Sequence, residues 1–360
     1  MAVHFHPLTI RDIRKETPDC ISVEFEIPEH LKDQFAFIHG QNLTLRKTID
    51  GTELRRSYSI CTSPHEKSLR IAIKKAESGK FSGFANEFFR VGDQVDVMTP
   101  TGSFHTVLNK AQKKHYLAFA SGSGITPIIS ILKAILFFEP ESEFTLVYGN
   151  RNRNSIIFRE ELENLKNQYM TRFRLIHILS REEAELPLFS GRIDAEKCIQ
   201  LFKKLINIRT IDEFFICGPE QMIRSVNGFL SEQGVEEKKV HFELFTTPGE
   251  QQLTSKKDSS SVSTSGEQAK VTIMLDGKAS SFTLNYYGDS ILNAALHQGM
   301  DLPYACKGGI CSSCKAKLLI GEVEMEANYA LGKDELTQGF ILTCQSHPRS
   351  PDLFINFDDR

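Results

Sequence analysis

The sequence has no long apolar run. Its most apolar stretch, residues 125–138, is interrupted by Pro127, Ser130 and Lys133, and it is shorter than the roughly 20 residues that a bilayer-crossing helix needs. The N-terminus carries charged residues early and has no apolar core segment, so we expect no secretory signal. We therefore expect a cytoplasmic protein without a membrane partner, whose 360 residues form two or three domains.

The chain also lacks a strong excess of charge of one sign. It has 43 Lys and Arg against 46 Asp and Glu, and no basic stripe, which argues against a nucleic-acid partner. Residues 269–360 hold eleven acidic and eight basic side chains, which accounts for the whole net charge of −3. Residues 246–268, just before this part, are rich in Ser, Gln and Lys and nearly free of apolar residues, which predicts a flexible linker.

The remaining chain divides into three segments with different patterns, so we predict a multidomain protein. Residues 1–110 read as short strands separated by turns, with one helix around residues 83–89, which predicts an antiparallel β-barrel. Residues 111–245 alternate strand and helix, which predicts a doubly wound α/β domain with a parallel sheet. In residues 269–360 we expect a hairpin at Asp276-Gly277 and a short helix with Asp289 or Ser290 as its N-cap and Gly299 at its end.

Half of the eight cysteines lie close together near the C-terminus. Their C-x4-C-x2-C spacing with one distant cysteine is typical of plant-type [2Fe–2S] ligation, and Gly308 and Gly309 let the backbone approach the cluster. Tetrathiolate zinc is the alternative, although zinc sites usually pair two C-x2-C hooks. A Rieske centre is disfavoured because no cysteine is followed two positions later by His. The predicted metal ligands are Cys306, Cys311, Cys314 and Cys344.

Two short motifs in the α/β segment follow predicted strands. The glycines of Gly122-x-Gly124 permit a close backbone approach, and a helix beginning near Pro127 would point its N–H groups at a pyrophosphate. The second motif, Cys217-Gly218-Pro219, would lie at the same edge of the sheet. Each motif alone could also be an ordinary strand-to-helix turn, with Cys217 as a buried core thiol.

The barrel segment contains a further candidate site in residues 56–59. Arg56 could pair with a phosphate, Tyr58 could stack on a flat ring, and Ser59 could hydrogen-bond that ring. Downstream, Ser82 stands in a turn before the predicted helix, where backbone donors could meet a pyrophosphate. The alternative is an ordinary strand with a surface arginine and a half-buried tyrosine, followed by a turn.

In this order, the motifs RxYS, GxxS, GxGxxP and CGP of residues 4–245 resemble the ferredoxin–NADP reductase superfamily, and residues 269–360 resemble plant-type ferredoxins. The resemblance implies an FAD-binding barrel, an NAD(P)-binding domain and a β-grasp ferredoxin domain. It also implies catalytic roles for Ser59, Cys217 and Glu243 near the flavin. The implied cofactor-binding residues are Arg56, Ser57, Tyr58, Ser59, Ile73, Lys74, Lys75, Ser82, Gly122, Gly124, Thr126, Pro127, Ser180, Arg181, Cys217, Gly218, Pro219 and Phe245.

The order of flavin domain, nucleotide domain and C-terminal ferredoxin narrows this resemblance to the reductase components of oxygenases. Among these, the chain most resembles the reductase components of phenylacetyl-CoA (ring-1,2) epoxidase systems. Ketosteroid hydroxylase reductases share the order, as does phthalate dioxygenase reductase, which uses FMN. We expect FAD, because the segment at 79–82 supplies donors for a second phosphate. Ser180-Arg181 resembles a site for the 2′-phosphate, so we expect NADPH over NADH, with Arg151 and Arg192 as possible helpers.

These expectations combine into an electron path from NADPH through FAD and the [2Fe–2S] cluster to a diiron oxygenase. Two alternatives stay open. The cluster could be a redox sensor or a structural element, or the chain could be a flavin-bearing binding protein without turnover.

Overall fold

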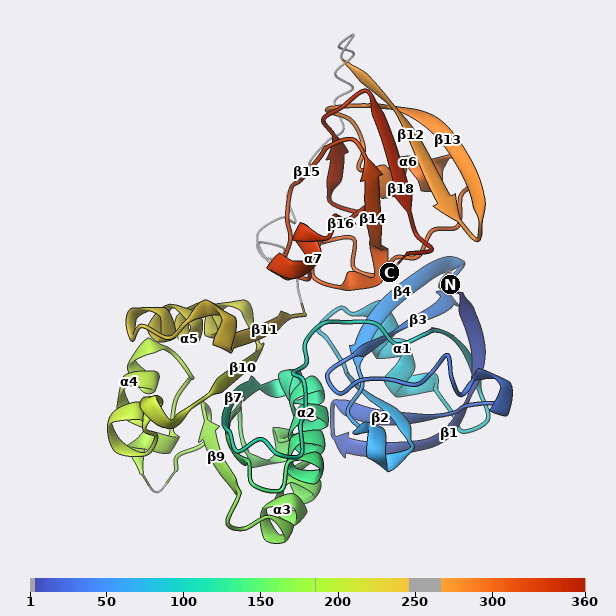
Figure 1. The fold of residues 1–360 in the computed structure, drawn as a ribbon. Helices are drawn as coiled ribbons and strands as arrows, with labels where there is room; N and C mark the ends of the chain where they lie inside the picture. Colours follow the sequence, from blue (N-terminus) through green and yellow to red (C-terminus); the bar gives the residue numbers. More distant parts are fainter. Residues whose placement is uncertain (1–3, 185, 246–266, 360) are drawn as a thin grey trace.

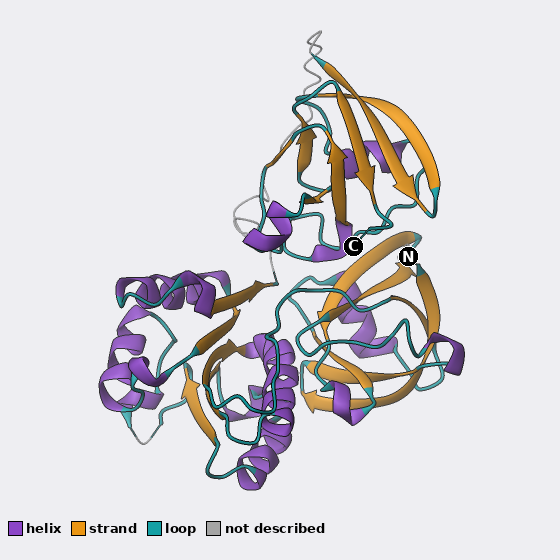
Figure 2. Cartoon of the chain, in the orientation of Figure 1, coloured by secondary structure: helices purple, strands orange, loops and turns teal. Residues whose placement is uncertain are grey.

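The computed structural model describes residues 4–184, 186–245 and 267–359. Three units succeed one another along the chain, each built on its own sheet (Figure 1). Most of the helical residues belong to the second unit (Figure 2). The predicted linker lies outside the described residues except for its last two positions, 267 and 268, of which Gln268 already belongs to a strand.

The first unit is an antiparallel sheet of six strands in the order β4-β3-β6-β1-β2-β5. Beyond the end of β4, Ile60 forms a bridge to Ile71 of β5, and this contact closes the sheet into the predicted barrel. The helix begins at Lys80, three residues earlier than expected, directly after Gly79. The elements are β1 (Phe5–Thr17), β2 (Cys20–Glu26), β3 (Asn42–Ile49), β4 (Thr52–Ser59), β5 (Leu69–Lys74), α1 (Lys80–Phe88) and β6 (Gln94–Met98).

The second unit is a parallel sheet of five strands in the order β11-β10-β7-β8-β9, as its alternating pattern predicts. Helices α2 and α3 pack on one face of this sheet, and α4 and α5 pack on the other. The elements are β7 (His115–Ser121), α2 (Ile125–Phe138), β8 (Glu143–Asn150), α3 (Arg159–Gln168), β9 (Phe173–Leu179), α4 (Ala195–Lys204), β10 (Glu213–Gly218), α5 (Glu220–Glu232) and β11 (Val240–Leu244).

The third unit contains a five-stranded sheet in the order β13-β12-β18-β14-β16 and a small pair, β15-β17. Asp276 and Gly277 both have positive φ, which makes the two-residue hairpin turn that their sequence predicts. Ser290 caps α6 by accepting a hydrogen bond from the Asn293 N–H. The elements are β12 (Gln268–Leu275), β13 (Lys278–Asn285), α6 (Ile291–His297), β14 (Lys315–Ile320), β15 (Val323–Met325), α7 (Lys333–Thr337), β16 (Phe340–Leu342), β17 (Ser346–Pro348) and β18 (Asp352–Asn356).

The hydrophobic cores show how the three units depend on one another. The barrel has its own core, but Cys20, Cys61 and Ala72 of the barrel join the core between the parallel sheet and α2. The third unit also has its own core, and only Ile310 and Tyr329 reach across to pack on the core of the second unit, among the residues that the structure describes. The first two units are therefore joined by shared burial, whereas the third rests on them through a smaller contact.

Within the described residues, none of the helices has the length and apolar character that crossing a membrane requires.

Candidate functional site

The two glycine-containing motifs of the second unit meet at the carboxyl edge of its sheet. A Cβ on Gly124 would lie 2.1 Å from the carbonyl oxygen of Cys217, so only glycine permits this approach. The turn is fixed from both sides, because Tyr148 donates a hydrogen bond to the Gly122 carbonyl and Thr126 donates one to the Ser123 carbonyl. Helix α2 begins immediately after this turn, so its N-terminus faces the edge where nucleotides bind in such sheets.

The three residues with expected catalytic roles lie together where the barrel meets this edge. Ser59 ends β4 and donates a hydrogen bond to Oε2 of Glu243 at 3.2 Å, although 184 positions separate the two residues. Cys217 is the register partner of Glu243 between the parallel strands β10 and β11. The structure therefore brings a hydroxyl, a thiol and a carboxyl into one place from two domains.

Burial controls the protonation of this group. Desolvation raises the pKa of Glu243 to about 8, against the opposing effect of the Ser59 hydrogen bond. Desolvation also raises the pKa of the Cys217 thiol well above its usual range. Burial therefore favours the protonated form of both groups.

The barrel residues expected at the flavin lie along β4, β5 and the start of α1. The ring of Tyr58 packs 5.9 Å from the ring of Phe81 in a tilted arrangement, and burial raises the pKa of Tyr58. Ser82 holds the preceding turn in place by accepting from the Ala76 N–H and donating to the Gly79 carbonyl. Its hydroxyl thus shapes the turn whose backbone was expected to meet a phosphate.

The basic residues of this region have different surroundings. Lys74 approaches the glycine turn of the second unit, with its Nζ 3.8 Å from the position that a Cβ of Gly122 would take. Lys75 instead pairs with Glu87 of α1, on the surface. The side chain of Arg56 donates to the carbonyl oxygen of the preceding residue.

The residues expected at the adenosine end lie farther along the same sheet edge. The Ser180 N–H donates to the carbonyl of Asn150, and the Arg181 N–H donates to the carbonyl of Arg151. These backbone bonds fix the loop after β9 and leave the Arg181 side chain exposed. Arg151 and Arg192 are also exposed. Phe245, the last described residue before residues 246–266, is 36 % exposed.

The four C-terminal cysteines form one contiguous group of free thiols. The Sγ atoms of Cys306 and Cys311 are 3.1 Å apart, and Cys314 and Cys344 both pack in the hydrophobic core of this unit. The N–H groups of Gly308 and Cys306 donate to the sulfurs of Cys306 and Cys311, and such backbone donors stabilise the thiolates that ligate an iron–sulfur cluster.

Zinc and a [2Fe–2S] cluster require different arrangements of the four sulfurs. Tetrathiolate zinc needs four sulfurs around one ion, whereas a [2Fe–2S] cluster divides its thiolates between two irons. Gly309, with φ of +74°, brings the loop so near the Ala327 carbonyl that a Cβ would lie 2.8 Å from it.

The cluster loop faces the site at which Ser59 and Glu243 meet. The hydroxyl of Ser313, next to Cys314, lies 2.9 Å from the hydroxyl of Thr44, which in turn lies 3.0 Å from that of Ser57. Thr44 and Ser313 are both buried, and Cys311 is near enough to Glu243 to contribute to its raised pKa. Nothing in the sequence indicates the Thr44–Ser313 contact, because it joins two ordinary polar residues of separate domains.

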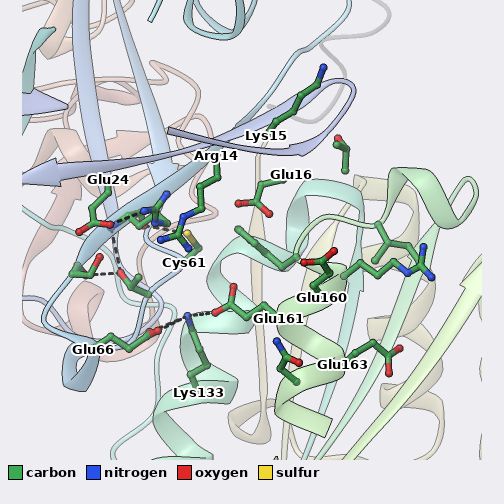
Figure 3. A pocket seen from close by; sticks show the side chains of 18 of the residues that line it. Arg14, Lys15, Glu16, Glu24, Cys61, Glu66, Lys133, Glu160, Glu161 and Glu163 are labelled. Carbon is green, nitrogen blue, oxygen red and sulfur yellow. Dashed lines mark hydrogen bonds and ion pairs between the residues drawn. The ribbon is translucent and has the colours of Figure 1, made fainter. Parts of the chain in front are cut away.

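A separate cavity of about 1340 Å³ lies between the barrel and helices α2 and α3, and none of the expected flavin or nucleotide residues lines it (Figure 3). Its buried cations are already paired with carboxylates. Lys133 lies between Glu66 and Glu161, and Arg70 pairs with two carboxylates of the barrel. This cavity is therefore lined largely by charged side chains at the boundary between two domains, and it is separate from the residues expected to bind the flavin and the nucleotide.

Comparison with known proteins gives a consistent result for each unit. Residues 7–106 match the oxidoreductase FAD-binding domain, residues 119–228 the oxidoreductase NAD-binding domain, and residues 273–349 the 2Fe-2S iron-sulfur cluster binding domain. These matches fall on the barrel, the α/β unit and the cysteine-bearing unit.

Two similar proteins span nearly the whole chain. One component of the 1,2-phenylacetyl-CoA epoxidase of Escherichia coli is 45% identical, with 98% of each chain covered. The ferredoxin reductase component of the 3-ketosteroid-9-alpha-monooxygenase of Rhodococcus rhodochrous is 32% identical, with 97% of this chain and 96% of the relative covered. Among solved structures, phthalate dioxygenase reductase shares the fold over 98% of each chain, with a TM-score of 0.57 and 24% identity.

Proposed function

This chain belongs to the ferredoxin–NADP reductase superfamily, among the members that carry a C-terminal [2Fe–2S] ferredoxin domain, and on that basis we propose that it delivers electrons from NADPH to a multicomponent diiron oxygenase. We propose phenylacetyl-CoA 1,2-epoxidase, an enzyme of aerobic phenylacetate degradation, as that oxygenase. The 45% identity to a component of such an epoxidase over 98% of both chains supports this choice above other oxygenases.

The position of the cluster loop carries the electron-transfer part of the proposal. Ser313 of the loop contacts Thr44 in the barrel, and Cys311 lies near Glu243 in β11, the last strand of the second domain. A bound flavin takes two electrons as a hydride from a nicotinamide nucleotide, and a [2Fe–2S] cluster accepts them one at a time. The contact between the cluster loop and the barrel supports a short path from the flavin to the cluster.

We assign the roles of the surrounding residues on the same basis. Arg56, Ser57 and Tyr58 would hold and stack the flavin, and Ile73, Lys74, Lys75 and Ser82 would form its phosphate site, with the ring of Phe245 nearby. Glu243, which accepts the Ser59 hydrogen bond, would position Ser59, and Cys217 would lie beside it. The nucleotide would lie along the edge formed by Gly122, Gly124, Thr126, Pro127, Ser180, Arg181, Gly218 and Pro219.

Replacing Ser59 by Ala is expected to slow NADPH-driven reduction of ferricyanide about a hundredfold, because a misplaced reacting group costs roughly that factor in rate. Cytochrome c reduction should fall in parallel, because both activities depend on the same hydride step. Thr52→Ala, at the exposed opposite end of β4, serves as the control and should keep the wild-type rate. A Ser59→Ala protein that binds flavin and turns over normally would remove Ser59 from the reacting site.

The choice of NADPH rests on Arg181. Its side chain is exposed beside the expected ribose site, and an arginine fork suits a phosphate dianion. Arg181→Gln should weaken NADPH binding by about 1.5–3 kcal/mol, or roughly tenfold to a hundredfold, and leave NADH nearly unchanged. Steady-state KM values for both nucleotides measure this difference.

Arg174→Gln provides a control on β9, the strand that precedes Arg181, because the Arg174 guanidinium donates to the carbonyl of Leu205 away from the nucleotide edge. Equal losses for NADPH and NADH in Arg181→Gln would show that this arginine does not read the 2′-phosphate.

The acceptor is tested by reconstitution. The purified chain, NADPH and the oxygenase component of a phenylacetyl-CoA epoxidase should together consume phenylacetyl-CoA, and a ketosteroid oxygenase component should be served poorly in the same assay. The opposite preference would assign the chain to another oxygenase. Activity with ferricyanide alone, and with neither oxygenase, would favour a sensor or structural role for the cluster.

A further inference from the structure

One arginine of the barrel is buried between the barrel and the ferredoxin domain. Arg55 lies in β4, only 6 % exposed, next to the expected flavin residues. Its Nη2 donates to Oδ1 of Asp301 at 3.0 Å, and its Nη1 donates to the carbonyl of Leu302 at 3.1 Å. Its guanidinium carbon lies 4.2 Å from the centre of the Tyr304 ring. All three partners immediately precede the first cluster cysteine, Cys306.

The same guanidinium is held firmly from the barrel side. Its Nε donates to Oε1 of Glu53 at 2.8 Å, and the ring of Phe5 lies 5.0 Å from its guanidinium carbon. Arg55 therefore donates from all three guanidinium nitrogens and contacts an aromatic ring of each domain. Such a planar, preorganised donor set loses less entropy on contact than a lysine would.

The other charged contacts of the interface are far more exposed. Lys333 of α7 pairs with Glu237, and their side chains are 79 % and 81 % exposed. His4 lies 3.2 Å from Asp276, at 60 % and 44 % exposure. Exposed pairs of this kind contribute little to association. Among the charged groups described at this interface, Arg55 is thus the one buried deeply enough for its contacts to stabilise the association of the two domains.

We propose that Arg55 is the positioning residue that docks the ferredoxin domain, and thereby holds the cluster loop on the flavin site. This inference rests on the proposed function. The guanidinium of Arg55 fixes the position of residues 301–304. Because only one residue separates Tyr304 from Cys306, the position of the first cluster ligand is fixed with them. The hydrogen bond between Thr44 and Ser313 fixes the other side of the cluster loop against the barrel.

The first test is Arg55→Ala in the full-length protein, measured by anaerobic stopped-flow mixing with NADPH. Loss of charge-assisted hydrogen bonds shifts a docking equilibrium about tenfold, so cluster reduction should slow by about that factor. Ferricyanide reduction should stay at the wild-type rate, because Arg55 takes no part in the hydride step. Flavin and iron content are measured first, to show that the variant has folded and loaded.

Arg14→Ala is the control. Arg14 lies in β1 of the same barrel, pairs with Asp12 of its own strand and lines the cavity beside α2 and α3, so it shares no partner with Arg55. It should leave cluster reduction unchanged. Arg55→Lys keeps the charge without the fork, so its rate should fall between those of Arg55→Ala and the wild type.

A second variant tests the contact from the other side and does not disturb the barrel. Asp301, whose side chain is 73 % exposed, can be changed to Asn in the ferredoxin domain. Asp301→Asn should also slow cluster reduction, and the double variant with Arg55→Ala should be no slower than Arg55→Ala alone. A wild-type rate of cluster reduction in an Arg55→Ala protein with full flavin and iron content would overturn the proposal. A double variant whose rate falls by the product of the two single effects would overturn it as well. Failure of the proposed function looks different, because NADPH would then not reduce the cluster even in the wild type.

Discussion

Cytochrome c reduction is expected to fall to the background rate in a Cys311→Ser variant that still reduces ferricyanide at the wild-type rate. Cys311 is buried, touches Cys306 and accepts the N–H of Cys306, so its loss removes a ligand and a fixed point of the loop. The flavin and nucleotide residues belong to the two other domains, with their own cores, so hydride transfer should continue. Iron and sulfide analysis should give two irons in the wild type and none in the variant.

Cys198→Ser is the matched control for this variant. Cys198 is equally buried, but it lies in α4 on the far face of the parallel sheet, away from both cofactor regions. It should keep iron, flavin and both activities. A Cys311→Ser protein that retains its iron and reduces cytochrome c would contradict the assigned ligand set.

A chain ending at Thr247 is expected to bind FAD and reduce ferricyanide with NADPH, but to lose transfer to cytochrome c and to an oxygenase. The barrel and the α/β domain share a core that the ferredoxin domain does not enter. Truncation uncovers only a limited apolar contact, since Ile310 and Tyr329 are the described ferredoxin residues that pack on the second domain's core. The shortened chain should therefore fold, at some cost in stability.

Adding the ferredoxin domain back as a separate chain of residues 267–360 should restore transfer only in part. In the intact protein the linker keeps the domain at an effective concentration on the order of millimolar, which a dilute free domain lacks. Restoration should rise with the concentration of the added domain, and Arg55→Ala in the truncated chain should weaken it. A truncated protein that drives an oxygenase at full rate without the added domain would mean that the cluster is off the electron path.

Much of this architecture was predictable because its signals are local. The Asp276-Gly277 turn, the Ser290 cap and the cysteine spacing each occupy a few adjacent residues, and each has a direct physical reason. The parallel sheet follows from repeated strand and helix patterns. Helix α1 begins at Lys80 rather than near Gly83 because the turn held by Ser82 lets the chain enter the helix earlier, which its pattern alone does not indicate.

The contacts between domains could not be predicted in the same way. Arg55 and Asp301 are 246 positions apart, and neither belongs to a motif that marks it as a partner of the other. The same holds for the contact between Ser59 and Glu243, because only the family resemblance predicted that the two residues lie near each other. Domain boundaries at 1–110, 111–245 and 269–360 remain our proposal, with the third sheet beginning at Gln268.

Rapid freezing after anaerobic mixing of the full-length protein with NADPH tests the central claim most directly. Flavin absorbance reports the hydride step, and the electron paramagnetic resonance signal of a reduced [2Fe–2S] cluster reports the next one. We predict that the flavin is reduced first and that the cluster signal then rises at least as fast as turnover with the oxygenase. A fully reduced flavin beside a cluster that stays oxidised through many turnovers would contradict the account.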